Sequence, residues 1–344
     1  MSTSTNYREV LKKNSRKTLT VMGLFILIYL IVGLIIDLVI QSSVYHGMYS
    51  LGELFVSLIT FTIIPYATII FVIVALISIA ITLMFHNQIM MVGTEYKEIT
   101  SDNAASLLEK QIYNAVEEMK IASGMQYMPK VFIINAGYMN AFASGFNEKN
   151  AMIAITAGLA QKLSRDELQA VLAHELSHIR HGDIKLTIVA SVLSNLMLMI
   201  IDVLFWSAIF SSNNRDSRDE RNGNQLMLIV MLLKFILPLV TVLLMLFLSR
   251  SREYMADSGA VELMRDNTPM ARALLKIAKD HEYNQAAYTR AYQSVPGEYI
   301  RHQAYIFDPI QAGISSGNSI GEMFSTHPSI ENRLRELGYE VSSD

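Results

Sequence analysis

The residues best suited to chemistry in this chain lie in the run Ala170 to Asp183, which reads A-V-L-A-H-E-L-S-H-I-R-H-G-D. On an α-helix, side chains four positions apart lie one above the other on the same face. His174 and His178 could therefore direct both imidazoles at one zinc ion. Glu175 lies one position further round and is placed to take a proton from a metal-bound water. The spacing predicts a zinc-dependent hydrolytic centre.

The surrounding residues predict that this run is helical. Ser164 and Glu167 have the spacing of a capping box at a helix start. Apolar residues then recur at helical spacing, at Leu163, Leu168, Val171, Leu172 and Leu176. The alternative is a chance match on a surface helix. The apolar stripe and the capping signal favour the metal site.

A hydrolytic zinc site needs a third protein ligand and leaves a fourth position for water. The chain contains no cysteine, so this ligand must come from Glu, Asp or His. Glu253 and Asp257 share a helix face, and they suit a ligand and a carboxylate hydrogen-bonded to a ligand histidine. Alternatively, the two acids belong to a solvated helix face or to a cluster of charges beside the membrane. His181 is a further candidate ligand, but its position before Gly182 favours a helix C-terminus.

The composition predicts a membrane protein with a sizeable water-facing part. Hydrophobic residues make up 51% of the 344 residues, and charged residues 17%, below the usual soluble value of about 25%. The net charge of −3 gives no reason to expect a nucleic-acid partner. Four apolar stretches are long enough to cross a bilayer: Val21 to Ile40, Phe55 to Phe85, Ile184 to Phe210 and Leu226 to Leu248.

Three residues inside these stretches are unusual there. Pro65 predicts a kink in the second stretch. Asp37 and Asp202 are acids near the outer ends of their stretches, and an intramembrane acid is a candidate functional residue.

The positive-inside rule orients the chain, because basic residues collect on the cytoplasmic side. Five precede the first stretch (Arg8, Lys12, Lys13, Arg16 and Lys17), whereas the loop from Gln41 to Leu54 has none. We therefore expect a cytoplasmic N-terminus. The last two stretches should form a hairpin, since the candidate ligands on either side of it must meet. Residues 211–224 then lie outside, although Arg215, Arg218 and Arg221 count against an external loop.

The expected domains follow from this topology. They are a cytoplasmic N-terminus with two transmembrane helices (1–85), a first cytoplasmic catalytic part (86–183), a transmembrane hairpin (184–248) and a second catalytic part that carries the third ligand (249–344). The predicted fold class is a membrane α-helical protein with four transmembrane helices and a small α+β, zincin-like catalytic domain. Its small sheet is expected to be antiparallel or mixed.

The first catalytic part shows patterns of both helix and strand. Asp102 is a candidate cap for a helix that ends near Gly124. Short β-type runs cover Val131 to Ile134 and Met152 to Thr156. Asn140 to Gly145 lies between them and taken alone is an ordinary turn or edge strand. Beside a metalloprotease helix, it predicts an exposed edge to which an extended substrate adds by backbone hydrogen bonds.

Taken together, these motifs resemble the HtpX-type membrane zinc metallopeptidases, which are related to the CAAX prenyl endopeptidases. The resemblance covers roughly Arg16 to Leu337. It rests on the order of the apolar stretches and on four motifs: His174-Glu-Leu-Ser-His178, Glu253-x-x-x-Asp257, Asn140-Ala-Phe-Ala143 and Thr326-His327-Pro328 with Arg333. It implies an endopeptidase with one Zn²⁺ per subunit in the cytoplasmic membrane. Its active site would face the cytosol and act in quality control of misfolded or damaged membrane proteins.

The resemblance also implies roles for individual residues. It assigns His174, His178 and Glu253 to zinc and Glu175 to catalysis. Asp257 would support a ligand histidine. His327 becomes a candidate for stabilising the oxyanion, and Arg333 for pairing with a carboxylate of the site. The residues expected to bind substrate are Asn140, Ala141, Phe142 and Ala143.

Three alternative functions differ from this one in their substrate or in what they require of the sequence. A CAAX-type processing peptidase would share the chemistry and differ in substrate. A catalytically silent membrane scaffold would not need the intact Glu175. A transporter would call for inverted repeats and broken helices at mid-membrane, and the sequence suggests neither. The expected partners are therefore polypeptide substrates, chiefly membrane proteins, and the lipid bilayer.

Overall fold

The computed structural model describes residues 7–45, 48–182, 184–212, 220–295, 301, 304–308 and 327–339. The chain forms two units, which are described separately. The helical unit comprises Leu19–Met84 and Val189–Leu243. The sheet unit comprises Met1–Thr18, Phe85–Ile188 and Leu244–Asp344.

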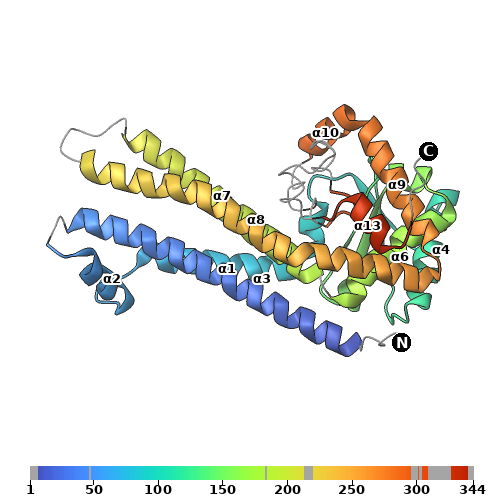
Figure 1. Ribbon diagram of the computed structural model, residues 1–344, viewed down its shortest axis with the longest axis horizontal. Coiled ribbons are helices and arrows are strands. Elements are labelled where there is room, and N and C mark those ends of the chain that lie inside the picture. Colours follow the sequence, from blue (N-terminus) through green and yellow to red (C-terminus); the bar gives the residue numbers. More distant parts are fainter. Residues whose placement is uncertain are drawn as a thin grey trace. The chain divides into compact units, whose positions relative to one another are not determined.

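The helical unit is built from parts of four long helices (Figure 1): α1 (Tyr7–Val44), α3 (Tyr66–Met91), α7 (Ile184–Ser212) and α8 (Glu220–Met264). Three of them contain segments long and apolar enough to cross a membrane: Leu19–Ser42, Tyr66–Met91 and Thr187–Trp206. The described side chains of α8 give a shorter apolar stretch, Leu228–Val240. The predicted span Leu226 to Leu248 includes residues whose side chains lie outside the described part, so the fourth crossing stays a prediction.

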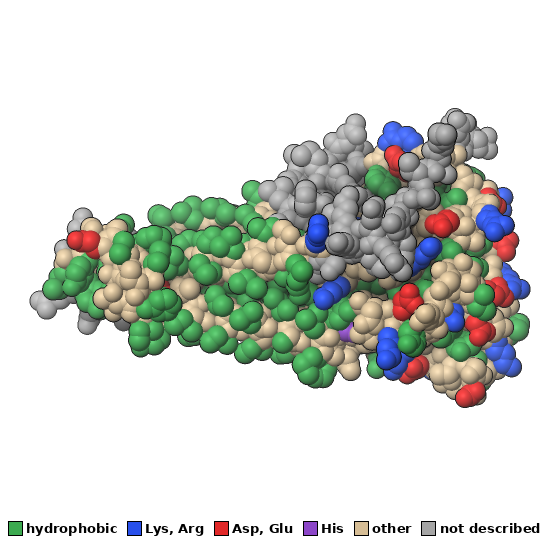
Figure 2. All heavy atoms as spheres, turned by 90° about the horizontal axis from the view of Figure 1, so that it is seen from below, with side chains coloured by type: hydrophobic (Ala, Val, Ile, Leu, Met, Phe, Trp, Pro, Cys, Tyr) green, Lys and Arg blue, Asp and Glu red, His purple; other side chains and the backbone are tan. Residues whose placement is uncertain are grey.

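The surface of the helical unit is that of a membrane protein. Large apolar side chains are exposed along its helices, among them Leu27, Ile31, Ile73, Ile77, Leu232 and Phe235. Figure 2 shows hydrophobic side chains covering most of the visible helical surface, whereas the Lys, Arg, Asp and Glu side chains gather mainly on the sheet unit. Contiguous apolar surface of this kind calls for contact with lipid or with another apolar surface.

The second apolar stretch contains two helices. The prediction of one kinked helix from Phe55 to Phe85 is wrong, because α2 (Leu51–Ile59) ends before Pro65 and α3 begins after it. Proline lacks an N–H and disfavours helical geometry in the residue before it. The helix is therefore interrupted between Ile59 and Tyr66, with Pro65 directly before the start of α3. The distortion inside α3 lies instead at Phe85, whose φ is −120° and ψ 22°.

The buried acid Asp37 caps the start of α3. Its Oδ1 accepts a hydrogen bond from the Ala67 N–H at 2.9 Å, and its Oδ2 accepts from the Thr68 N–H at 2.7 Å. These donors belong to the first turn of α3 and have no partner within the helix. Gly33 lies one turn before Asp37, and a Cβ there would be 2.5 Å from the Thr68 Cα. Asp37 and Gly33 together hold α1 against the start of α3, so the structure gives this acid a structural role.

Other polar contacts join helices of the same unit. The Tyr29 hydroxyl on α1 donates to the Leu193 carbonyl of α7 at 2.9 Å. Asp202 on α7 lies 3.1 Å from the Lys234 Nζ of α8, and this Nζ lies 4.0 Å from the centre of the Phe205 ring. The ion pair gives Asp202 a local partner.

The close approach at Gly33 gives a stability prediction with a matched control. Gly33→Ala should lower the thermal unfolding midpoint in detergent, because an added methyl group forces two backbones apart at a cost of about 1–3 kcal/mol. Gly23→Ala, on the same helix, has nothing within 4 Å of the new Cβ and should be neutral or stabilising. Equal midpoints for the two variants would show that α1 does not pack on α3 in this way.

The sheet unit contains a mixed four-stranded sheet of order β1-β2-β4-β3. The strands are β1 (Tyr96–Ile99), β2 (Lys130–Ile134), β3 (Ala141–Ser144) and β4 (Met152–Thr156). β2 and β4 are parallel, and the other two pairs are antiparallel. The predicted strands at Val131 and Met152 are confirmed, and so is a small mixed sheet. β3 forms one edge of this sheet.

Helices pack around this sheet (Figure 1). They are α4 (Leu107–Ala122), α5 (Ala157–Lys162), α6 (Arg165–His181), α9 (Thr268–Tyr283), α10 (Gln285–Ser294) and α13 (Ile330–Glu336). The N-cap of α4 is Ser106, which forms a capping box with Glu109, so the prediction of Asp102 as its cap is wrong. α6 contacts α4, α9 and β3, and it therefore lies in the interior of this unit.

Candidate metal centre

The helix α6 holds the metal-binding motif in a fixed register. The Ser164 side chain accepts from the Glu167 N–H, and Glu167 reaches back to the Ser164 N–H at 2.8 Å. Both interactions of the predicted capping box are present. The helix ends at Gly182, whose φ of 64° suits glycine. The predicted helix C-terminus at His181 is therefore confirmed.

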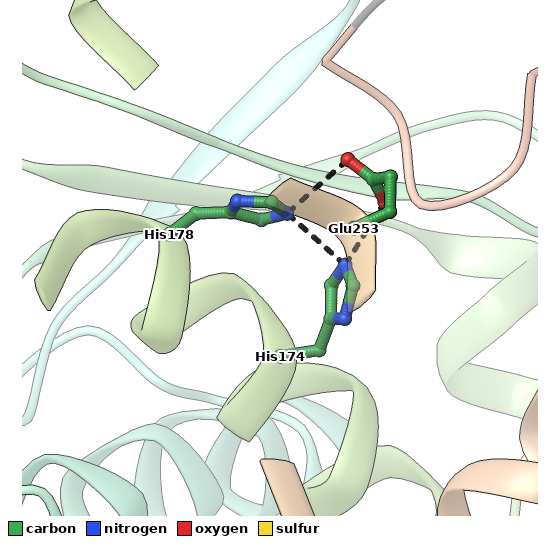
Figure 3. Close-up of side chains that lie close together, drawn as sticks. All are labelled: His174, His178 and Glu253. Atoms are coloured by element: carbon green, nitrogen blue, oxygen red, sulfur yellow. Dashed lines mark hydrogen bonds and ion pairs between the residues drawn. The ribbon is translucent and has the colours of Figure 1, made fainter. Parts of the chain in front are cut away.

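His174 and His178 direct their rings at a common point, as Figure 3 shows. The two Nε2 atoms lie 3.1 Å apart. His174 and the adjacent Glu175 are fully buried, whereas His178 is partly accessible. The helical spacing therefore has the effect predicted for two metal ligands.

Glu253 comes to the same point from α8. Its Oε2 lies 3.6 Å from the His174 Nε2, and its Oε1 lies 3.6 Å from the His178 Nε2. Ligand atoms at tetrahedral zinc distances would be about 3.3 Å apart. The buried Oε2 of Glu253 has no hydrogen-bond partner among the described residues, a costly state that a cation would relieve. Two imidazoles and one carboxylate thus fit a zinc ion in spacing and in chemistry.

A second layer of charge supports His174. Its Nδ1 lies 2.9 Å from the Asp257 Oδ1. Arg333 in turn donates two hydrogen bonds to Asp257, of 2.8 Å from Nε and 2.6 Å from Nη2. A neutral His174 that carries its proton on Nδ1, beside Asp257, would direct its Nε2 lone pair at the metal position. The structure thus brings Asp257 to a candidate ligand histidine, and it pairs Arg333 with a carboxylate.

The charge states of these groups favour a cation. Burial raises the pKa of Glu253, but His327, His178 and His174 hold it well below its usual range. Burial also raises the pKa of Asp257, but Arg333 and then His174 hold it below its usual value. Burial lowers the pKa of His174, but Asp257 and Glu253 raise it to about 9, so a metal ion at this point would displace the proton from Nε2. The ionised carboxylates thus attract positive charge to the point where the three candidate ligands meet.

Glu175 lies beside these ligands in a small pocket. The pocket is lined by Ala143, Glu175, His178, Ile184, Thr187, Arg252, Glu253 and Ala304. Burial raises the pKa of Glu175, whereas His174 and His178 oppose the rise. A carboxylate with a raised pKa, open to a pocket beside the metal position, has the properties of a general base.

Of the two remaining histidine candidates, His327 borders the site and His181 does not belong to the ligand group. The His327 Nε2 is 3.9 Å from the Glu253 Oε1 and its Nδ1 is 3.8 Å from the Asp308 Oδ2, so it borders the site. Its motif neighbour Thr326 lies outside the described residues. His181 is not part of the described group of possible metal ligands, which contains His174, His178 and Glu253.

The predicted substrate strand is less open than expected. Asn140, Ala141, Phe142 and Ala143 are all buried. Tyr305 forms an antiparallel bridge with Phe142 on the outer edge of β3. This contact could not be predicted from the sequence, because it joins residues that are far apart in the chain.

The comparisons agree with this geometry. Residues 106–341 match the model of Peptidase family M48. The chain belongs to peptidase family M48. A protein called "Protease HtpX homolog" from Helicobacter pylori (strain Shi470) is 41% identical over 338 residues, which are 98% of this chain and 99% of that protein. One of the same name from Bacteroides fragilis (strain YCH46) is 36% identical over 229 residues, 66% of this chain and 68% of that protein.

The solved structure of S. mikatae Ste24p is 17% identical in sequence and aligns with a TM-score of 0.48. The alignment covers 96% of this chain and 67% of the Ste24p chain. The expected family is confirmed by the match to the M48 model and by the relatives. The chain is an HtpX-type metallopeptidase of family M48 and a multi-pass membrane protein.

Proposed function

We propose that this M48 peptidase binds one zinc ion through His174, His178 and Glu253 and cleaves misfolded or damaged membrane proteins on the cytosolic side. The observation that carries the proposal is the meeting of three ligand atoms from α6 and α8 at one buried point. When bound there, zinc would supply a Lewis acid for the attacking water and the scissile carbonyl.

The residues of the chain perform the proton transfers. Glu175 accepts a proton from the attacking water and returns it to the leaving amine. His327, at the border of the site, donates a hydrogen bond to the oxyanion of the tetrahedral intermediate. Asp257 and Arg333 hold the His174 ring in place. Ala143 in β3 presents backbone to the peptide beside Glu175.

The cytosolic side follows from topology. Two apolar stretches separate His178 from Glu253 in the sequence. If only one of them crossed the bilayer, the ligands would be about 30 Å apart on opposite faces. If neither stretch crossed, both stretches would lie in the membrane interface, but they lack the charged face that interfacial helices carry. Two crossings keep both ligands on the side where the positive-inside rule places the chain after the first two spans. The domain division given above is proposed on this basis.

Cysteine labelling tests this orientation cleanly, because the chain has no native cysteine. Asn213→Cys, at a position outside the described residues, should react with a membrane-impermeant reagent in intact cells. Lys149→Cys, in the sheet unit, should react only after permeabilisation. Labelling of Lys149→Cys but not of Asn213→Cys in intact cells would reverse the orientation. Equal protection of both would indicate a hairpin that does not cross.

The substrate class is tested with two purified substrates. A membrane protein with an unfolded cytosolic segment should be cleaved in detergent by wild type and not by Glu175→Gln. A prenylated peptide with a C-terminal CAAX sequence serves as the comparison. Cleavage of the prenylated peptide alone would favour the CAAX-type alternative over quality control.

A further inference from the structure

The outer edge of β3 carries a second segment of the chain. This segment, residues 304–308, is here called the strap. Tyr305 forms an antiparallel bridge with Phe142, and the Ile306 N–H donates to the Ala141 carbonyl at 2.9 Å. The strap therefore pairs with the edge to which an extended peptide would add.

This pairing brings the strap to the candidate general base. Residues of antiparallel strands pair in opposite chain order, so the bridge between Tyr305 and Phe142 places Ala304 opposite Ala143. Ala304 and Ala143 line the same pocket as Glu175. The position at which β3 would hold a peptide beside Glu175 is therefore already taken by the strap.

Side chains on both sides hold the strap in this position. Asn140 donates from Nδ2 to the Phe307 carbonyl at 2.8 Å and accepts at Oδ1 from the Phe307 N–H at 3.3 Å. The Arg333 Nη1 donates to the Ile306 carbonyl at 2.7 Å, while its Nε and Nη2 donate to Asp257. The guanidinium that holds the strap thus also holds the carboxylate behind the metal position.

The start of the strap is tied to the end of α3. The Ala304 N–H donates to the Arg301 carbonyl at 2.7 Å. Arg301 is fully buried and donates from Nη1 to the Met90 and Val92 carbonyls, at 3.0 and 2.7 Å. At the C-terminal end of a helix, carbonyls lack a partner within the helix, so this guanidinium caps α3. Arg301 therefore fixes the point from which the strap extends along β3.

The pairing of the strap with β3 is short. It is an isolated bridge, whereas β3 pairs with β4 over four residue pairs. Each further backbone hydrogen bond adds to the free energy of pairing. Lifting the strap from β3 therefore breaks less backbone pairing than opening the sheet between β3 and β4 does.

We propose that the strap is an autoinhibitory strand, which occupies the edge of β3 beside Glu175 until a peptide substrate displaces it. The proposal rests on the proposed function and deepens it, since it concerns how that site admits its substrate. Tyr305, Ile306 and Phe307 are buried, so a displacing peptide must be an extended chain that replaces their contacts with β3. Segments already paired within a folded protein cannot take this place. The strap therefore restricts cleavage to unfolded segments.

Weakening the strap should make the site easier to enter. Ile306→Pro removes the N–H that donates to Ala141. It should lower KM about two- to tenfold with kcat unchanged, because the edge is open in a larger fraction of the molecules. Ile306→Val keeps this N–H and should behave as wild type. A KM equal to or above that of wild type, in an Ile306→Pro variant whose circular dichroism is native, would contradict an autoinhibitory strap.

A disulfide that locks the strap on β3 is the second test, because the chain has no native cysteine. Ala141 and Ile306 lie opposite each other as a hydrogen-bonded pair. The Cα atoms of such pairs are about 5.5 Å apart, within the range of a disulfide. Zinc-loaded Ala141→Cys/Ile306→Cys should cleave casein in detergent when it is reduced. Oxidation should lower kcat/KM by about tenfold or more, since the locked strap leaves no open fraction, and reduction should restore it at unchanged zinc content.

Ile306→Cys alone is the control, and the same oxidation should not change its activity. An oxidised double variant that cleaves as fast as its reduced form, with the disulfide verified by thiol titration, would overturn the proposal. Failure of the two thiols to form a disulfide would overturn it as well, because the strap would then not lie on β3. Absence of casein cleavage by both wild type and the reduced double variant would instead count against the proposed function.

Discussion

Replacing Glu175 by Gln is expected to lower peptidase activity by about 10²–10⁴-fold, the usual contribution of a general base. The carboxamide has nearly the same shape as the carboxylate, so a residue that is only 1% exposed keeps its packing. Zinc should stay bound, because Glu175 is not among the three residues that offer ligand atoms. The measurement is cleavage of casein in detergent together with metal analysis of the same preparation.

Asp166→Asn is the matched control, because Asp166 lies exposed in the first turn of the same helix. It should keep wild-type activity and metal content. Peptidase activity close to wild type in a metal-replete Glu175→Gln preparation would remove Glu175 from its role as the base. Loss of zinc from that variant would instead make it a ligand.

Replacing Glu253 by Ala is expected to lower zinc affinity by more than about 100-fold, since it removes one of three candidate ligands. Asp257→Asn, on the next turn of α8, should lower the affinity less, by about 10–100-fold, because Asp257 acts through the His174 ring. Asn is preferred to Ala here since it keeps an acceptor for the buried Arg333. Competition with a chromophoric chelator measures both affinities, and circular dichroism reports whether each variant is folded.

The order of the two effects is the informative result. A folded Glu253→Ala variant that binds zinc as tightly as wild type would mean that His181, His327 or another acid supplies the third ligand. A larger loss for Asp257→Asn than for Glu253→Ala would exchange the roles of the two carboxylates.

The metal site could be predicted from the sequence because its information is local. His174 and His178 are brought together by one helix turn, and the capping box at Ser164 fixes where that helix begins. Glu253 was found by its spacing to Asp257 and by the resemblance. The meeting of α6 with α8 depends on tertiary packing, which spacing alone does not show.

Other features could not be predicted, since they depend on long-range contacts. The Ile306 N–H donates to the Ala141 carbonyl, although the two residues are far apart in the sequence. The sequence marks Asp37 as a candidate functional acid, whereas its hydrogen bonds to the Ala67 and Thr68 N–H groups give it a structural role. From the sequence alone Pro65 predicts a kink within one helix, because the sequence does not show that Asp37 on α1 caps a new helix start after this proline.

Removing the metal from the purified full chain and restoring it stepwise with zinc tests whether the peptidase activity depends on a metal ion. Peptidase activity should be absent without metal, rise in proportion to bound zinc and reach its maximum at one zinc per chain. Glu175→Gln should take up the same single equivalent and stay inactive. Activity that persists in the metal-free protein, or that does not follow zinc occupancy, would contradict a catalytic zinc ion at His174, His178 and Glu253.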